Sequence, residues 1–210
     1  MKNIAEQIAE QLLQIKAIKL EPTNHFTWAS GWYSPIYCDN RKTLSFPSVR
    51  GFIRDSFVDV INQNFADYDV IAGVATGAIA QGALVADALK KPFIYIRSKA
   101  KDHGLENLIE GYLEPNSKVL VIEDLISTGG SSLSAVKAVR AAGSEVVGMA
   151  AIFSYNFETA RKAFEAEGVK LVTLSNYDVL LKHATETGYI KQSDMATLEE
   201  WRRDPGSWKK

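Results

Sequence analysis

The stretch of the chain best suited to chemistry is VLVIEDLISTGGSSLSAVKAV, residues 119–139. An apolar run ends in two carboxylates, Glu123 and Asp124, and a short loop rich in hydroxyls and glycine leads into an amphipathic segment. Gly129 and Gly130 allow backbone N–H groups to converge, and the start of a helix adds partial positive charge. Residue types in this order are suited to binding a phosphate monoester.

The hydroxyls and the acids together indicate a phosphorylated sugar. The phosphate can be held by the hydroxyls of Ser127, Thr128, Ser131 and Ser132. Two adjacent carboxylates would repel a polyphosphate but can accept hydrogen bonds from sugar hydroxyls. The loop has neither the Gly-Lys-Ser/Thr of a Walker A loop nor the G-x-G-x-x-G spacing of a dinucleotide fingerprint. The alternative is that Asp124 caps a turn and the glycines only shape it.

A second group of useful residues is a run of cations, Arg97, Lys99, Lys101 and His103, where the predicted strand 93–97 meets the long interval 98–118. Compact domains usually spend about four to six residues on such a connection. In an extended segment alternate residues share a face, so several of these cations would point at one anion. The pattern predicts a lid over an anionic ligand, and the alternative is a surface insertion.

The elements that must position these residues alternate along the chain. Apolar runs suited to strands are Asp69–Ala75, Phe93–Arg97, Val119–Asp124, Val146–Phe153 and Leu171–Ser175. Helical patterns lie between them at 78–90, 131–143 and 157–168. Strands buried on both faces read as continuous Val/Ile/Leu runs, so the fold class predicted is α/β, with a central, mostly parallel sheet and right-handed crossovers. Ligands of such sheets bind at the carboxyl ends of the strands.

The N-terminal part follows other patterns. An apolar stripe at helical spacing predicts an opening helix that packs on the core, through Ile4, Ile8, Leu12 and Ile15. Residues 26–41, FTWASGWYSPIYCDNR, have no helical period and predict loops and short strands at a ligand subsite. Three aromatic residues there could stack on a substrate or form a dimer interface: Trp28, Trp32 and Tyr33.

Composition bounds the class of protein. The chain has 210 residues, with 24 Lys+Arg against 25 Asp+Glu and a hydrophobic fraction of 46%. These values are typical of a globular protein with one large domain. A formal charge of −1 argues against a nucleic-acid coat protein. A single cysteine, Cys38, and an N-terminus without a signal-peptide pattern predict a cytoplasmic protein.

VLVIEDLISTGGSS closely resembles the phosphoribosyl-pyrophosphate (PRPP) signature of the type I phosphoribosyltransferases. RSKAKDHG and FTWASGWYSPIYCDNR resemble the orotate-specific members of that family. The resemblance implies a single domain over 1–210, with residues 1–45 and the C-terminal region forming a hood and residues 98–110 a flexible lid. It also implies phosphoribosyl transfer from PRPP to orotate in pyrimidine biosynthesis, giving orotidine 5′-monophosphate and pyrophosphate.

The resemblance further implies a role for individual residues. Glu123 and Asp124 match the acids at the ribose hydroxyls. The 5′-phosphate loop matches Ser127, Thr128, Gly129, Gly130 and Ser131, and Leu125 and Ile126 are also implied to bind PRPP. The pyrophosphate would be gripped by Arg97, Lys101 and His103. The catalytic residues implied are Lys101, His103 and Asp124, and those at the orotate are Ser127, Tyr37, Cys38 and Tyr155.

The implied assembly is a homodimer, because the lid in that family covers the active site of the neighbouring subunit. Mg²⁺ is expected as the cofactor, bound through substrate and water rather than by a protein metal cage. No nucleic acid and no membrane are expected as partners.

Several positions depart from the family pattern. Ala29 and Ser98 stand where many relatives have Lys, and Gly77 stands where some do. Tyr155 or Asn156 stands where some have an Arg for the orotate carboxylate. A lone Cys on an apolar segment also fits a packing role, and His25 and His183 have no partner at metal or triad spacing.

Two other functions remain open from the sequence. A purine or uracil phosphoribosyltransferase is disfavoured by the aromatic N-terminal segment. A regulator that binds the ligand and acts on nucleic acid would need a basic face.

Overall fold

The computed structural model describes residues 2–98 and 108–209. The helices are α1 (Ile4–Gln14), α2 (Pro47–Asn64), α3 (Ile79–Leu89), α4 (Gly130–Ala141), α5 (Glu158–Ala166), α6 (Tyr177–Glu186) and α7 (Met195–Arg203), with 3₁₀ turns at η1 (Asn40–Ser45) and η2 (Gln192–Asp194). The strands are β1 (Ile18–Leu20), β2 (Phe26–Thr27), β3 (Tyr33–Ser34), β4 (Ile36–Cys38), β5 (Val70–Val74), β6 (Phe93–Ile96), β7 (Ile109–Glu110), β8 (Lys118–Ile126), β9 (Glu145–Ser154) and β10 (Leu171–Asn176).

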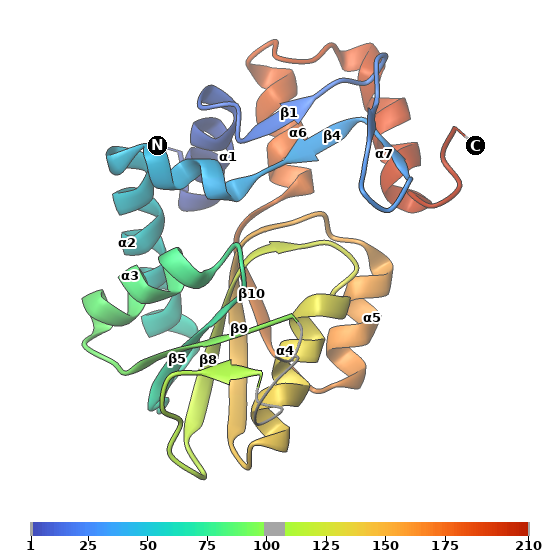
Figure 1. Ribbon diagram of the computed structural model, residues 1–210. Helices are drawn as coiled ribbons and strands as arrows, with labels where there is room; N and C mark the ends of the chain where they lie inside the picture. The colour runs from blue at the N-terminus through green and yellow to red at the C-terminus, as the bar shows by residue number, and fades with distance from the viewer. Residues whose placement is uncertain (1, 99–107, 210) are drawn as a thin grey trace.

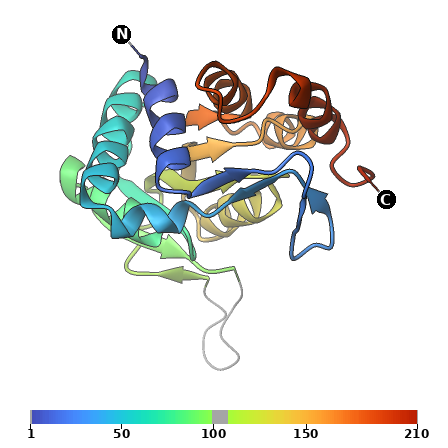
Figure 2. The same ribbon diagram turned by 90° about the horizontal axis from the view of Figure 1, so that it is seen from above.

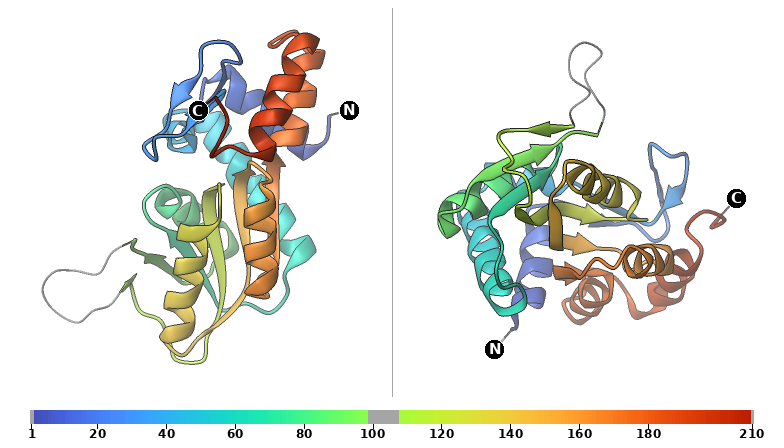
Figure 3. Two further views of the ribbon diagram at one scale, coloured as in Figure 1. Left: turned by 90° about the vertical axis from the view of Figure 1, so that its right-hand side faces the viewer. Right: turned by 90° about the horizontal axis from the view of Figure 1, so that it is seen from below.

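The centre of the molecule is one sheet with the strand order β10-β9-β8-β5-β6-β7. All its neighbouring strands run parallel except β6 and β7. Helices α4 and α5 cover one face, while α2 and α3 cover the other (Figures 1 and 3). Because β5, β8 and β9 are covered on both sides, their apolar runs are nearly continuous. The predicted α/β class is confirmed.

The N-terminal and C-terminal elements lie together above the carboxyl ends of the central strands (Figure 1). Seen from above, α1 lies beside α2, and the β1–β4 pair crosses over the ends of the sheet (Figure 2). Helix α1 carries the predicted apolar stripe, with Ile8 and Leu12 fully buried. Its start is closed by a capping box between Asn3 and Glu6.

Helix α2 was not predicted from the sequence, because neither a helix nor a strand was assigned to residues 47–64. Pro47 stands at its first turn, a position that proline favours. Its buried apolar residues recur every four positions, at Val49, Ile53, Phe57 and Ile61. That spacing is the signal that would have identified the helix.

The interval 98–118, expected as one long loop, contains a strand. Ile109 and Glu110 form β7, which pairs antiparallel with β6. The N–H of Arg97 donates to the carbonyl of Leu108 at 2.8 Å and extends this pairing. Lys99, Lys101 and His103 lie outside the described residues. In residues 2–98 and 108–209, no helix is both long and apolar enough to cross a membrane.

Candidate active site

The loops that follow β5 and β8 meet at the carboxyl edge of the sheet and enclose a cavity of about 300 Å³. One wall comes from Val74, Ala75, Thr76 and Gly77. The other comes from Glu123, Asp124, Leu125, Ser127, Thr128, Gly129, Gly130 and Ser131. The structure therefore brings together nearly all the residues predicted to bind PRPP on β8 and its loop. The exception is Ile126, whose side chain is fully buried in the core.

The N-terminus of α4 forms one end of this cavity, hereafter the β5–β8 cavity. Gly129 precedes the helix with a φ of +85°, and no side chain caps the helix start. The first-turn N–H groups and the helix dipole therefore favour an anion at this end. A side chain at Gly129 would be strained by the positive φ, and its Cβ would lie 3.1 Å from the Phe164 ring.

Glu123 points into the protein and is only 4% exposed. Its Oε1 accepts a hydrogen bond from the Asp124 N–H at 2.9 Å, and its Oε2 accepts one from the Ser132 hydroxyl at 2.9 Å. Burial, followed by the charge of Asp124, raises the pKa of Glu123 well above its ordinary value. Through its hydrogen bond with the Asp124 N–H, the buried Glu123 side chain thus holds the backbone at Asp124 in place.

Ser132 differs from its expected place among the phosphate hydroxyls. It lies on the inner face of α4, is buried, and donates to Glu123. Hydroxyls available to a phosphate are therefore those of the loop itself, at Ser127, Thr128 and Ser131.

The carboxylate of Asp124 lies directly against Gly77. A Cβ added at Gly77 would overlap all three atoms of that carboxylate group. Glycine at this position therefore leaves room for the Asp124 carboxylate in the orientation seen here. The carbonyl of Asp124 accepts a hydrogen bond of 2.6 Å from the buried Asn40 side chain. No role for Asn40 was predicted from the sequence, although Asn40 lies within the segment 26–41 expected to form a ligand subsite.

A second cavity, of about 280 Å³, adjoins the first and is hereafter the aromatic cavity. It is lined by Thr27, Trp28, Ala29, Tyr37, Cys38, Leu125, Ser127 and Tyr155. All four residues predicted at the orotate line it. Leu125 and Ser127 line both cavities, so the two spaces meet at the end of β8.

Tyr155 forms a wall of the aromatic cavity, while Asn156 turns away from it. The Tyr155 ring is 2% exposed and stacks on Trp28, with the ring centroids 5.3 Å apart. The Asn156 side chain instead donates to Asp178 at 2.9 Å. Within residues 2–98 and 108–209, the side chains that line the aromatic cavity are all uncharged.

Cys38 has the environment of a packing residue. Its thiol donates to the Asn40 side chain at 3.4 Å. Burial, and then the nearby Asp124 and Asp39 carboxylates, raise the pKa of this thiol well above its ordinary value. The neutral thiol is therefore not a nucleophile near neutral pH.

Arg97 follows β6 and lines neither cavity. Its Nη1 lies 3.5 Å from a carboxylate oxygen of Glu110 on β7. The other two predicted pyrophosphate ligands, Lys101 and His103, lie outside the described residues. His183 is buried in α6, and His25 packs against Tyr33 and Trp208.

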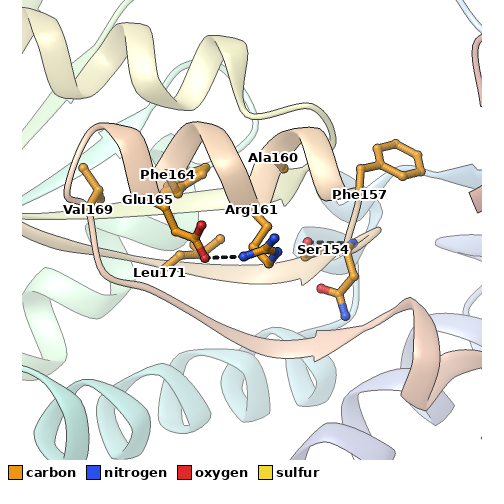
Figure 4. A pocket seen from close by; sticks show the side chains of 9 residues that line it. Ser154, Phe157, Ala160, Arg161, Phe164, Glu165, Val169 and Leu171 are labelled. Carbon is orange, nitrogen blue, oxygen red and sulfur yellow. Dashed lines mark hydrogen bonds and ion pairs between the residues drawn. The ribbon is translucent and has the colours of Figure 1, made fainter. Parts of the chain in front are cut away.

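A larger cavity, of about 470 Å³, lies between α5 and β10 (Figure 4). Its floor is apolar, and the Arg161 side chain at its rim is held by Glu158 and Glu165. Among the described residues, those lining it include Asn156 but none of the residues assigned to PRPP or orotate, and none lines either of the two adjoining cavities. Size therefore does not identify the active site.

A parallel sheet with a carboxylate, hydroxyls and an uncapped helix start at its carboxyl edge is the arrangement of a phosphoribosyltransferase. The profile of the phosphoribosyl transferase domain matches residues 49–179, and the chain belongs to this family.

Relatives specify the acceptor. The chain is 61% identical to the orotate phosphoribosyltransferase of Bacteroides fragilis over 99% of this chain and 98% of the relative. It is 58% identical to the orotate phosphoribosyltransferase of Porphyromonas gingivalis, with 99% of each chain covered. The chain therefore transfers the phosphoribosyl group from PRPP to orotate, giving orotidine 5′-monophosphate and pyrophosphate in pyrimidine biosynthesis. This result decides against the purine, uracil and regulator alternatives.

Solved structures show the same fold. Orotate phosphoribosyltransferase from Aeropyrum pernix is 27% identical, with a TM-score of 0.76 over 88% of this chain and 99% of that one. Mycobacterium tuberculosis orotate phosphoribosyltransferase in complex with PRPP is 27% identical, with a TM-score of 0.66 over 85% of this chain and 99% of that one.

Proposed function

We propose that the two adjoining cavities divide the substrates between them. The ribose 5-phosphate part of PRPP occupies the β5–β8 cavity, and orotate occupies the aromatic cavity. The observation that carries this proposal is that Leu125 and Ser127 line both spaces. A base in one cavity and a sugar in the other would face each other across Ser127, as attack by the orotate nitrogen on the sugar carbon requires.

The phosphate end of the site uses the loop before α4. The 5′-phosphate accepts hydrogen bonds from loop N–H groups and from the hydroxyls of Ser127, Thr128 and Ser131, supported by the dipole of α4. The left-handed backbone at Gly129 shapes this loop.

Asp124 faces the sugar. Its carboxylate accepts hydrogen bonds from the ribose hydroxyls and stabilises the positive charge that develops on the sugar as pyrophosphate leaves. Glu123 acts through the Asp124 N–H, and Asn40 acts through the Asp124 carbonyl. These two buried contacts fix the backbone from which the carboxylate projects.

The leaving pyrophosphate carries the growing negative charge, so cations belong beside it. Arg97 stands at the end of β6, next to the loop that follows β5. In the β5–β6 pair Val74 lies opposite Ile96, the residue before Arg97. This position supports a role for Arg97 at this edge of the site. Lys101 and His103 are proposed as its partners from the family resemblance.

Mg²⁺ fits the residues present. Among residues 2–98 and 108–209 there is no group of three or more His, Cys, Asp or Glu side chains that could hold a metal ion. Mg²⁺ commonly binds through one or two carboxylates together with substrate oxygens and water. Asp124 is the carboxylate that would hold it, and the ion would supply charge neutralisation at the pyrophosphate.

The proposed organisation is one domain over 1–210, with residues 1–45 and the C-terminal region as a hood and 98–110 as a lid. The hood is supported by the hydrogen bond from the Trp201 indole to the Tyr33 carbonyl at 3.2 Å. A homodimer with shared sites is proposed on the family resemblance. A cytoplasmic location is proposed because both substrates are charged metabolites.

Two single substitutions test the division of substrates. Tyr37 is 42% exposed and lines only the aromatic cavity, and Ser131 is exposed and lines only the β5–β8 cavity. Tyr37→Ala should raise the KM for orotate about fivefold through loss of ring contact. Ser131→Ala should raise the KM for PRPP about tenfold through loss of a hydrogen bond to a charged group. Equal effects of each substitution on both KM values would contradict the division.

A further inference from the structure

Trp201 on α7 is a fully buried aromatic residue behind the aromatic cavity. Its ring lies edge-on to Trp28 and to Tyr155, with centroid distances of 5.6 Å in both pairs. It also packs on Phe157 at 5.3 Å and Tyr177 at 5.4 Å. Trp28 and Tyr155 line the aromatic cavity, whereas Trp201 does not. Trp201 therefore touches the walls of the cavity without facing its interior.

Hydrogen bonds fix these rings in place. The Trp201 indole N–H donates to the Tyr33 carbonyl, which ties α7 to the β2–β3 hairpin. The Trp28 indole N–H donates to the Ile36 carbonyl at 3.0 Å. Trp28 and Tyr155 therefore pack against each other and against Trp201, which does not line the cavity.

A second contact from α7 reaches the residue after Tyr155. Arg202 pairs with Asp178 at 2.6 Å, and Asp178 accepts a hydrogen bond from the Asn156 side chain at 2.9 Å. Asn156 has a φ of +55°, a left-handed conformation that few residues other than glycine and asparagine adopt readily. Its N–H donates to the Ser154 hydroxyl at 3.0 Å, and Ser154, Asn156 and Phe157 all line the α5–β10 cavity (Figure 4).

We propose that α7 is a positioning element for the acceptor base, with Trp201 and Arg202 as its positioning residues. Trp201 holds the Trp28 and Tyr155 rings directly, and Arg202 fixes the backbone beside Tyr155 through Asp178. A flat, anionic base then meets a preformed wall and does not bear the cost of ordering two large side chains. This inference rests on the proposed placement of orotate in the aromatic cavity.

The proposal predicts an effect on one substrate only. None of the α7 contacts described above involves the loop 127–131 or Gly77, which line the β5–β8 cavity. Loss of α7 contacts should therefore weaken orotate binding and leave PRPP binding nearly unchanged. A purely structural role would raise both KM values or reduce the amount of folded enzyme without changing either.

The experiment measures kcat and both KM values for substitutions at the two positions. Trp201→Leu should raise the KM for orotate about five- to tenfold, since it removes edge-on contacts to both cavity rings. Trp201→Phe keeps a ring and should give a smaller increase. Trp208→Phe is the matched control, because Trp208 is a buried tryptophan in the same C-terminal region that packs on His25. It should leave both KM values unchanged.

Arg202 provides a test that does not depend on a buried residue. Its side chain is 32% exposed and Asp178 is 55% exposed, so the protein should fold without this pair. Arg202→Gln should raise the KM for orotate about two- to threefold, in line with an exposed pair worth up to 1 kcal/mol. Arg202→Lys should have an orotate KM closer to that of the parent protein. If Trp201→Leu does not fold, these two variants decide the question.

Two outcomes separate the inference from the cavity assignment. Tyr155→Leu alters the cavity wall itself. An increase in the orotate KM for Tyr155→Leu but not for the folded Trp201 and Arg202 variants would overturn the role of α7 and leave the cavity assignment standing. If Tyr155→Leu and Tyr37→Ala also have no effect, the assignment of orotate to the aromatic cavity falls, and this inference falls with it.

Discussion

Replacing Gly77 with alanine tests whether the orientation of the Asp124 carboxylate matters for catalysis. The backbone at Gly77 is not in the left-handed region, so alanine adds no backbone strain there. Its Cβ would, however, overlap the Asp124 carboxylate group. The carboxylate must rotate away from the β5 loop, at a cost of about 0.5–1.5 kcal/mol for a displaced rotamer. The expected loss of folding stability is therefore small.

The expected loss of activity is larger. A hydrogen bond from a sugar hydroxyl to a carboxylate contributes about 1.5–3 kcal/mol. Loss of one such bond in the transition state should lower kcat/KM for PRPP about 10- to 150-fold. The assay follows the loss of orotate absorbance at varied PRPP and saturating orotate. Thermal unfolding of the same preparation measures stability.

A matched control and a double substitution make the test specific. Gly51 lies within α2, and a Cβ there would meet no atom within 4 Å. Gly51→Ala should stabilise the helix by up to about 1 kcal/mol and leave kcat/KM unchanged. In an Asp124→Asn background, Gly77→Ala should have little further effect, because the two changes remove the same interaction. Independent, additive losses would refute this explanation of Gly77.

Four further predictions concern other parts of the site and its proposed assembly. Glu123 has a pKa raised above 4.5 in the folded protein, so its contribution to stability is present below about pH 4.5 and is lost as pH rises toward the folded-state pKa. Urea unfolding at a series of pH values should show that Glu123→Gln removes this decline, and an unchanged pH profile would contradict the assignment. Ser132→Ala should destabilise the protein by about 1–3 kcal/mol at neutral pH, because it leaves a buried oxygen of Glu123 without its donor; a melting temperature equal to that of the parent would count against this. Alkylation of Cys38 by iodoacetamide should be much slower at pH 8 than that of an exposed thiol and should accelerate only at higher pH, since its pKa is raised. For the proposed shared sites, mixing Lys101→Ala chains with Asp124→Asn chains should restore activity, whereas verified subunit exchange without rescue would show that the lid acts within its own chain.

The main features of the fold could be predicted because local patterns carry them. Continuous apolar runs identify β5, β8 and β9, and the acid, hydroxyl and glycine pattern after residue 122 identifies the phosphate loop. Each of these signals lies within a short stretch of chain. The ends of the strands were predicted less accurately, since β8 continues to Ile126, two residues beyond its predicted end.

Features that depend on distant contacts could not be predicted in this way. Asn40 bonds to Asp124 across 84 residues, and Trp201 bonds to Tyr33 across 168. No local pattern indicates such pairs, and they decide which side chains line a cavity. Ser132 illustrates the limit, because its hydroxyl suits a phosphate in sequence while the turn of α4 directs it to Glu123.

Sugar and base are proposed to occupy adjoining cavities that meet at Ser127. The decisive measurement is a crystal structure with bound orotidine 5′-monophosphate. We expect the phosphate on the loop 127–131, the ribose hydroxyls at Asp124 and the base against Tyr37 and Tyr155. A base bound outside the aromatic cavity, with the phosphate still on that loop, would contradict it.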